Sequence, residues 1–441
     1  MAADARSLRG LLADELVQSQ QSGHDVDAGL LAVIQAAISE EAGEEAELGD
    51  LYRRLEAAPL RADWSFYEPS TLPEIMAAAG PGPRAVGRSG PEDLEDRILA
   101  AWLGRCAGCN LGKPVEGYGW NRLKLRTYLE TAGAFPLEDY LPVLDPMPEE
   151  FVLNPCWPVA TRGRVDGMAR DDDTDYTMLG LKILEKYGPG YTSADVGYEW
   201  LSGMPYKTVY TAERVAYGNL VLGLQPPATA TYHNPYREWI GAQIRADIFG
   251  YVAPGDPATA ARLAYQDAAL SHTANGIYGE MWAAALIASA FSASDAREAA
   301  EVALSVVPSR SRLAASLRAT LHAFDAGHTW EEAIASMEAR LEGYDWVHTL
   351  NNAEVVMAAL LWGDGDFGRT IGLAVEGGLD TDCDGATAGS VFGALHGTKS
   401  LPGHWVDPLH DTIHSALLGF DGASITDLAH RTAALARGAA G

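Results

Sequence analysis

The sequence predicts an all-α protein, on the strength of three observations. Apolar residues recur at the three- and four-residue spacing of helices that bury one face, and strand-like alternation is nearly absent. Two helical segments also carry glycines at four-residue spacing, which is typical of closely packed helices. A chain of 441 residues with 47% hydrophobic residues can bury a deep core.

The N-terminal part is expected to be helical and shows no recognisable chemistry. Two apolar stripes lie within residues 1–77, formed by Leu8, Leu11, Leu12 and Leu16 and by Leu30, Leu31, Ile34 and Ile38. Glycine and proline are concentrated at residues 80–91, a composition typical of a linker. We therefore predict an N-terminal helical extension with its linker at 1–90 and a second, larger helical domain at 91–441.

Two ridges of glycine lie far apart in the chain. They are formed by Gly104, Gly108 and Gly112 and by Gly385, Gly389, Gly393 and Gly397. Glycine costs ~1 kcal/mol relative to alanine in a helix, so these positions need a compensating gain, for which a close helix contact is the natural source. We expect both ridges to pack tightly in the core, and packing against each other is one such arrangement.

The segments that follow the first ridge are expected to be largely irregular. Pro114 ends the helix and leaves Glu116 on a loop at its C-terminal end. Residues 121–158 and 192–255 are rich in aromatic residues and proline, a composition that suits loops covering a pocket. Further helices are predicted at 258–269, 278–291, 296–306, 313–324 and 330–341, and Asn351, Asn352 and Glu354 are expected to cap the next helix.

The most informative stretch is an acidic turn that carries Asp380, Asp382 and Asp384 after Gly377-Gly378. Several hard oxygens can converge there on a cation such as magnesium, manganese or calcium. A calcium loop of the EF-hand type is excluded, because the twelfth position is Val391 and not the required glutamate. An acidic turn that merely caps a helix is the remaining alternative.

A second acidic cluster, about two hundred residues upstream, favours the metal hypothesis. Asp171, Asp172, Asp173 and Asp175 precede an apolar helix that Gly188-Pro189 should end. Carboxylates this close repel one another, and a bound cation relieves that repulsion. The sequence therefore predicts a metal site assembled from two acidic turns.

Net charge and cysteine usage limit the class of function. The formal charge of −28 disfavours nucleic acid and anionic membranes as partners. Charged residues at the N-terminus interrupt any signal-peptide core, so we expect a cytoplasmic protein. Cys106 and Cys109 form a C-x-x-C without a second pair at zinc spacing, and we interpret them as buried small residues.

Taken together, these pieces resemble the ADP-ribosylglycohydrolase family, of the dinitrogenase reductase-activating glycohydrolase type. The resemblance extends from about residue 94 to 400 and rests on the glycine-ridge segment Gly104 to Glu116, the Asp172-Asp173-Thr174 turn, the Ser271-His272 pair and the Asp380-Thr381-Asp382 turn. It implies a compact all-α bundle around a dinuclear centre of magnesium or manganese. Its implied function is hydrolysis of the N- or O-glycosidic bond to ribose in ADP-ribosyl or nucleoside-like substrates.

Individual roles also follow from the resemblance. The implied metal ligands are Asp172, Asp173, Asp380 and Asp382. Asp171 and Cys383 stand where the family commonly has metal-binding hydroxyl residues, so the ligand set is altered, and Asp384 or water is the expected substitute. Glu116 matches a mobile glutamate near the ribose and is the expected acid/base, while Asp173 orients water together with a metal. We expect substrate contacts in the polar run formed by Ser271, His272, Asn275 and Gly276.

The leaving group stays open at this stage. A modified protein side chain, a nucleobase and a small metabolite all fit the motifs, although the covering loops favour a small ligand. A metal-stabilised scaffold without activity is the alternative class, because the changes at Asp171 and Cys383 alter the ligand set. Retention of Glu116 argues against that alternative.

Overall fold

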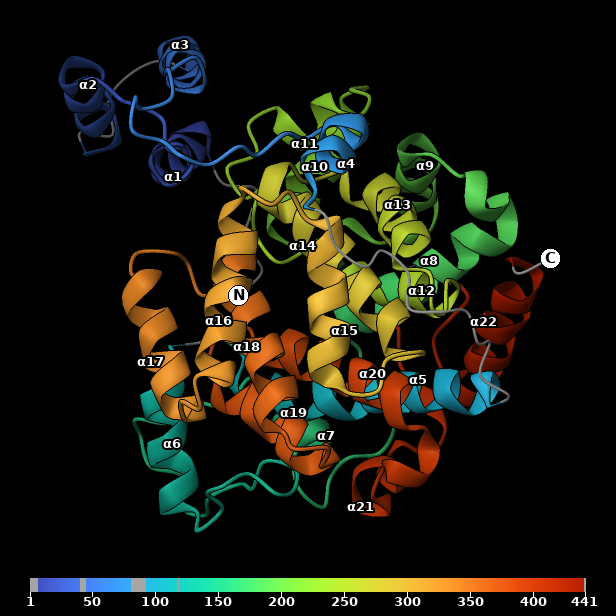
Figure 1. Cartoon of the computed structure of the whole chain (residues 1–441). Helices are drawn as coiled ribbons and strands as arrows, with labels where there is room; N and C mark the ends of the chain where they lie inside the picture. Colours follow the sequence, from blue (N-terminus) through green and yellow to red (C-terminus); the bar gives the residue numbers. More distant parts are fainter. Residues whose placement is uncertain (1–6, 40–44, 81–92, 118, 440–441) are drawn as a thin grey trace.

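The computed structural model describes residues 7–39, 45–80, 93–117 and 119–439, and these are predominantly helical (Figure 1). The all-α prediction is confirmed, since the described residues contain only two strands of two residues each. The predicted linker at 80–91 falls almost wholly outside them.

The N-terminal helices are α1 (Leu8–Gln21), α2 (Ala28–Ser39), α3 (Glu45–Glu56) and α4 (Leu72–Ala78). The first half of the larger region contains α5 (Leu94–Gly112), α6 (Arg122–Thr131), α7 (Trp157–Ala160), α8 (Asp172–Tyr187), α9 (Ser193–Gly203), α10 (Thr211–Val221), α11 (Ala228–Thr231), α12 (Asp247–Tyr251) and α13 (Pro257–Ala268). The second half contains α14 (Ala274–Ala290), α15 (Ala296–Ala303), α16 (Arg312–Asp325), α17 (Trp330–Arg340), α18 (Thr349–Trp362), α19 (Phe367–Glu376), α20 (Thr381–His396), α21 (Gly403–Val406) and α22 (Ile425–Ala439).

Short 3-10 turns connect several of these helices. They are η1 (Lys113–Val115), η2 (Gly188–Gly190), η3 (Tyr206–Thr208), η4 (Gln243–Arg245), η5 (Leu304–Val306), η6 (Thr398–Ser400) and η7 (Asp407–Leu409). The strands β1 (Thr412–Ile413) and β2 (Ala423–Ser424) pair antiparallel, with Thr412 opposite Ser424. No helix within the described ranges is both long and apolar enough to cross a membrane.

The glycine-ridge helices α5 and α20 pack directly against each other, as the ridges had suggested, and lie side by side in Figure 1. A Cβ on Gly104, Gly108 or Gly112 would come closer than 3.0 Å to the backbone of Gly389, Gly385 or Thr381 respectively. Numbers rise along α5 as they fall along α20, so the two helices are antiparallel. The end of α5 that leads to Glu116 therefore lies beside the start of α20.

Two predictions about helices are corrected by the structure. Residues 192–255, expected to be largely irregular, contain α9 to α12. A capping box between Thr192 and Asp195 begins α9, and aromatic residues such as Trp200 lie on the buried face of this helix. Helix α18 begins at Thr349, with His348 as its cap through a hydrogen bond from the Leu350 N–H to Nδ1 (3.2 Å). Asn351 and Asn352 thus lie within the first turn and are not caps.

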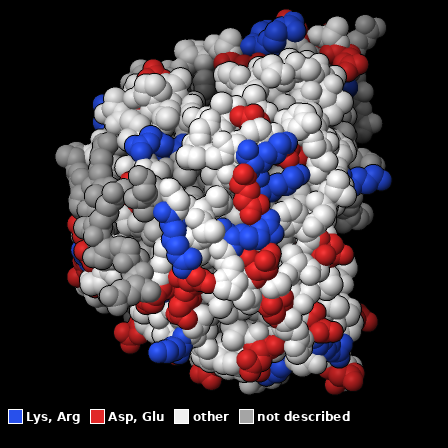
Figure 2. All heavy atoms as spheres, turned by 90° about the vertical axis from the view of Figure 1, so that its right-hand side faces the viewer, with Lys and Arg blue, Asp and Glu red and all other residues white. Residues whose placement is uncertain are grey.

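The N-terminal helices have a hydrophobic core separate from that of the main body. The large core joins most helices from α4 onwards, with two smaller clusters beside it, while α1, α2 and α3 enclose a small core of their own that contains Leu12, Ile34 and Tyr52. These three helices form a distinct group beside the main body in Figure 1. Acidic and basic side chains are interspersed over the described residues on the face in Figure 2.

The contact between α5 and α20 predicts opposite effects for two glycine substitutions. Gly108→Ala should lower the free energy of unfolding by about 1–3 kcal/mol, because the new methyl group would collide with the backbone of Gly385. Gly218→Ala in α10, where a Cβ meets nothing within 4 Å, should be neutral or stabilising by up to ~1 kcal/mol. Denaturant unfolding of both variants measures the difference. Equal stability of the two proteins would contradict the proposed tight contact.

Candidate metal and active site

Three helix ends meet at one cavity of about 420 Å³. The C-terminal end of α5 with η1, the start of α8 and the start of α20 contribute its acidic wall. The predicted residues that line it are Glu116, Asp172, Asp173, Asp380, Asp382 and Cys383. The side chain of Thr381 donates to the Gly112 carbonyl (2.9 Å) and so fixes the start of α20 against the end of α5.

Two groups of buried side chains place possible ligand atoms within 4.8 Å of one another. One consists of Cys109, Asp171, Asp173 and Asp382, and the other of Asp380, Asp382 and Cys383. Asp382 belongs to both groups and joins the two acidic turns, which come from opposite halves of the domain. Carboxylate oxygens predominate, so the donor set fits a hard divalent cation better than a soft one.

Arg105 and Lys113, both from the α5 region, offset part of this negative charge. The fully buried Arg105 donates to the Asp247 carboxylate (2.8 Å) and to the Asp173 carbonyl (2.8 Å), and lies 3.3 Å from the Asp173 carboxylate. Lys113 contacts the Asp171 carboxylate and lies 4.0 Å from that of Asp382. Even with Arg170, which also lines the cavity, three cations do not balance at least five carboxylates, so the residues present fit the binding of divalent metal.

Asp171 is engaged in ways that do not require a metal. Its Oδ1 accepts a hydrogen bond from the Asp173 N–H (2.9 Å) and caps α8, while its Oδ2 contacts Lys113. Lys113 therefore neutralises the additional carboxylate at this position. The role of Asp171 as a metal ligand stays a prediction.

Burial and crowding shift the acidities of the cluster. Burial, against the opposing effects of Arg170 and Lys113, raises the pKa of Asp172 to about 6. Burial, opposed by Arg105, raises the pKa of Asp173 to about 8. Burial and the neighbouring Asp382 raise the pKa of Asp380 well above its usual range. Each of these carboxyl groups holds a proton more tightly than in water, which a bound cation would displace.

Cys383 is a weaker candidate ligand than the carboxylates. Burial and the surrounding aspartates raise the pKa of its thiol, so the thiol remains protonated and donates to Asp173 Oδ2 (3.1 Å). A neutral thiol is a poor ligand for magnesium or manganese. Asp384 lies in neither group of ligand atoms and does not line the cavity, and both its buried oxygens lack a hydrogen-bond partner. The completion of the metal shell by Cys383 or Asp384 stays a prediction.

Glu116 faces the cavity from the loop beyond η1. Its Oε2 lies 3.4 Å from the amide nitrogen of Asn154, and burial together with Asp382 raises the pKa of Glu116 well above its usual range. The next residue, Gly117, has φ +57°, and a Cβ there would lie 3.2 Å from the Trp346 ring. This loop therefore places, beside the acidic clusters, a carboxyl group that holds its proton more tightly than in water.

The four predicted substrate-binding residues lie behind the cavity wall. His272 Nε2 is 3.8 Å from the carboxylate of Glu213, which does line the cavity, and Ser271 bonds to His272 Nδ1 (2.8 Å). Asn275 donates to Glu238 (2.8 Å), and a Cβ on Gly276 would collide with the Arg237 carbonyl. None of the four is among the residues that line this cavity. Direct substrate contact by them stays a prediction.

Several residues that line the cavity could not be identified individually from the sequence. These are Tyr210, Glu213, Trp239, Asp345 and Trp346. Only the density of aromatic residues in 204–239 pointed to their neighbourhood. Asn352 was also missed: its amide oxygen accepts from the Asp380 N–H (3.1 Å) and its amide nitrogen donates to the Trp346 carbonyl (2.8 Å). It thereby links the acidic turn to an aromatic wall.

Most of the chain is similar in sequence to a known protein family. A family model described as ADP-ribosylglycohydrolase matches residues 90–440. A solved structure described as an ADP-ribosylglycohydrolase-related protein complex is 20% identical, covers 78% of this chain and 99% of its own, and superposes with a TM-score of 0.42. No curated protein sequence matches this chain.

The raised pKa values of Asp172 and Asp173 predict that metal affinity depends on pH. Because Asp172 and Asp173 are protonated below pKa values of about 6 and about 8, protons compete with the cation, and affinity for Mn²⁺ should fall as pH decreases through this range. Calorimetric titration with Mn²⁺ across the range measures the change and the protons released. Affinity independent of pH would show that these carboxyl groups do not bind the metal.

Proposed function

The chain belongs to the ADP-ribosylglycohydrolase family, and from that premise we propose that it is an active, metal-dependent hydrolase of the glycosidic bond to ribose in ADP-ribosyl or nucleoside-like substrates. The observation that carries the proposal is the position of Glu116. Its protonatable carboxyl group faces the same cavity as Asp172, Asp173, Asp380 and Asp382. A site that only stabilised the fold would have no use for that group.

The proposed cofactor is a pair of divalent cations, magnesium or manganese, held by these four aspartates. When bound, the cations would orient ribose hydroxyls and lower the pKa of a bound water. The two groups of converging ligand atoms, which share Asp382, support two positions for metal. The hard oxygen donors support magnesium or manganese as the identity.

The side chains have complementary proposed roles in the reaction. Protonated Glu116 donates its proton to the departing group as the bond to the ribose carbon breaks, and the resulting carboxylate then stabilises the positive charge that develops on the ribose. Asn154, near one oxygen of Glu116, helps to hold its orientation. Asp173 is fixed by Arg105 and Cys383, so its carboxylate has a defined direction in which to orient water.

We further propose a substrate smaller than a modified protein. Asn154, Tyr210, Thr211, Glu213 and Trp239 contribute to the cavity wall, and this lining from segments 121–158 and 204–239 supports a covered site, although Thr211 and Glu213 lie in helix α10 and not in a loop. The two basic residues in the cavity are both engaged: Lys113 with Asp171, and Arg170 with Asp175 (2.7 Å). This favours a nucleoside-like glycoside, whose base can stack on Trp239 or Trp346, over a substrate that must place a diphosphate here.

The inactive-scaffold alternative draws on one observation. Cys383 places a thiol, which donates to Asp173, where a hard oxygen would suit a metal better. Catalytic variants distinguish this alternative from the proposal, because a scaffold has no turnover to lose.

Two variants test the division of roles. Glu116→Gln should lower turnover by about 10²–10⁴-fold while metal binding is kept, because only proton transfer is removed. Asp382→Ala should remove metal and turnover together while the helical circular-dichroism signal is kept, since Asp382 lies at a helix start and links both groups of ligand atoms. Metal content and ribose release of both variants are measured against the wild type. A fully active Glu116→Gln protein would rule out this acid/base.

The substrate proposal predicts a rank order. Ribose or ADP-ribose release should be faster from free nucleosides and small ADP-ribosyl conjugates than from an arginine- or serine-modified protein under the same metal concentration. The cavity is lined on several sides and leaves little room for a polypeptide. Tenfold faster turnover of the modified protein, a difference of ~1.4 kcal/mol in activation free energy, would overturn the size argument.

A further inference from the structure

Helix α1 of the N-terminal extension is bonded to the chain segment that forms one aromatic wall of the cavity. We define the wall segment as residues 236–241, of which Trp239, Ile240 and Gly241 line the cavity. Residues 7–80 lie outside the part of the chain that the family model matches. The contacts across this boundary therefore belong to the extension of this chain.

The first link is a buried ion pair between α1 and Arg237. Both oxygens of Glu15 accept from the Arg237 guanidinium, at 2.6 and 2.9 Å. Glu15 is fully buried and also accepts from Ser19 of α1 and Tyr52 of α3 (2.9 Å each). A bidentate pair with its remaining lone pairs satisfied fixes both partners in one geometry.

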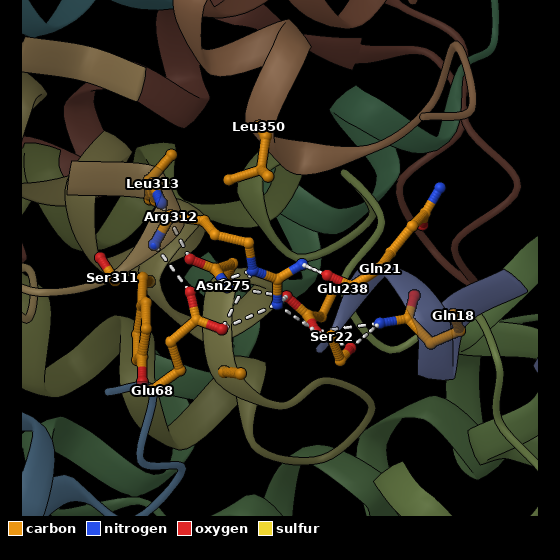
Figure 3. Close-up of polar contacts among 12 residues, drawn as sticks. Gln18, Gln21, Ser22, Glu68, Glu238, Asn275, Ser311, Arg312, Leu313 and Leu350 are labelled. Atoms are coloured by element: carbon orange, nitrogen blue, oxygen red, sulfur yellow. Dashed lines mark hydrogen bonds and ion pairs between the residues drawn. The ribbon is translucent and has the colours of Figure 1, made fainter. Parts of the chain in front are cut away.

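The second link centres on Glu238 (Figure 3). Its carboxylate accepts from Gln18 (2.9 Å) and Ser22 (3.0 Å) at the end of α1, and from Arg312 (2.7 Å) and Asn275 (2.8 Å) of the main body. The same guanidinium binds Glu68 of the extension (2.8 Å). Glu238 is thus held from both sides, immediately before Trp239 in the sequence.

The wall segment is hydrogen-bonded to a neighbouring segment that also lines the cavity. The Ile240 N–H donates to the Val347 carbonyl (2.8 Å), and the Thr349 N–H donates to the Glu238 carbonyl (3.2 Å). Asp345, Trp346 and Val347 line the cavity, and Gln21 of α1 donates to the nearby Gly343 carbonyl (2.8 Å). Trp239 and Trp346, which form the aromatic parts of the cavity wall, therefore both lie close to residues that α1 contacts.

We infer that the N-terminal extension positions the substrate cavity, with Glu15, Gln18 and Ser22 acting as positioning residues for the Trp239 wall. The contacts of α1 do not reach the proposed metal-binding carboxylates, because α5, α8 and α20 set the positions of those carboxylates. The extension should therefore control how tightly substrate binds and leave the binding of metal unchanged. Asn275, expected from the sequence to touch substrate, would act instead through Glu238.

Hydrogen exchange tests the inference without any assumption about activity. The double variant Gln18→Ala/Ser22→Ala removes both α1 side-chain donors to Glu238 and keeps the ion pairs of Glu238 and Arg237. Peptides that cover 236–241 and 345–349 should exchange at least about tenfold faster, while peptides of α5 and α20 are unchanged. Unchanged exchange at the wall would overturn the inference.

A matched control variant distinguishes a specific effect on the wall segment from a general loosening of the N-terminal extension. Arg310→Ala removes another side-chain contact between the extension and the main body, the hydrogen bond to the Ser65 carbonyl (2.8 Å), but Arg310 does not touch the wall segment. This variant should leave exchange at 236–241 as in the wild type. Equal acceleration in both variants would mean that the extension only stabilises the fold.

Kinetics provides the second readout and rests on the proposed function. With a hydrolysed nucleoside, the double variant should raise KM about tenfold and keep kcat within about twofold, because the wall contacts substrate while the acid/base and metal ligands are untouched. Mn²⁺ affinity should be unchanged. An unchanged KM would count against the inference. A wild-type protein that releases no ribose would refute the proposed function, and the exchange experiment would still decide the role of the extension.

Discussion

The antiparallel contact between α5 and α20 is the constraint on which the site depends. Glycines on both helices allow backbone to meet backbone, which no larger side chain would permit at Gly104, Gly108 or Gly385. Each glycine lowers helix stability by ~1 kcal/mol relative to alanine, so the packing contact must stabilise the fold by more than this loss. Its register brings the residues after α5 beside the start of α20. Glu116 and Lys113 consequently face Asp380 and Asp382, although more than 250 residues separate them in sequence.

The same contact explains why so many carboxylates can be buried together. Arg105 and Lys113 come from the α5 region and partly neutralise Asp173 and Asp171, which come from α8. Burial, together with the neighbouring carboxylates, raises the pKa values of Asp172, Asp173 and Asp380. These carboxyl groups therefore hold protons that a bound cation could displace, which suits a member of the ADP-ribosylglycohydrolase family, whose enzymes are generally metal-dependent.

The other walls of the cavity are assembled from distant segments by hydrogen bonds. Asn352 joins the Asp380 turn to the Trp346 carbonyl, and the backbone of Ile240 joins Trp239 to Val347. Through Glu15 and Gln18, helix α1 also bonds to the side chains of Arg237 and Glu238, which immediately precede Trp239. The acidic turns and the Trp239 wall thus have different supports, and Asn352 is a link between the Asp380 turn and the Trp346 wall.

The helical class, the glycine ridges, both acidic turns and the loop position of Glu116 could be predicted from the sequence, because each of these is a local pattern of spacing or residue type. The sequence did not determine which buried polar residues face the cavity. His272 and Asn275 lie behind the wall, while Glu213, Trp239 and Trp346 line it. Likewise, Asp171 combines a helix cap with an ion pair to Lys113 from another helix. Only the tertiary structure decides such outcomes, because the direction of a side chain depends on the partners that packing brings to it from remote parts of the chain.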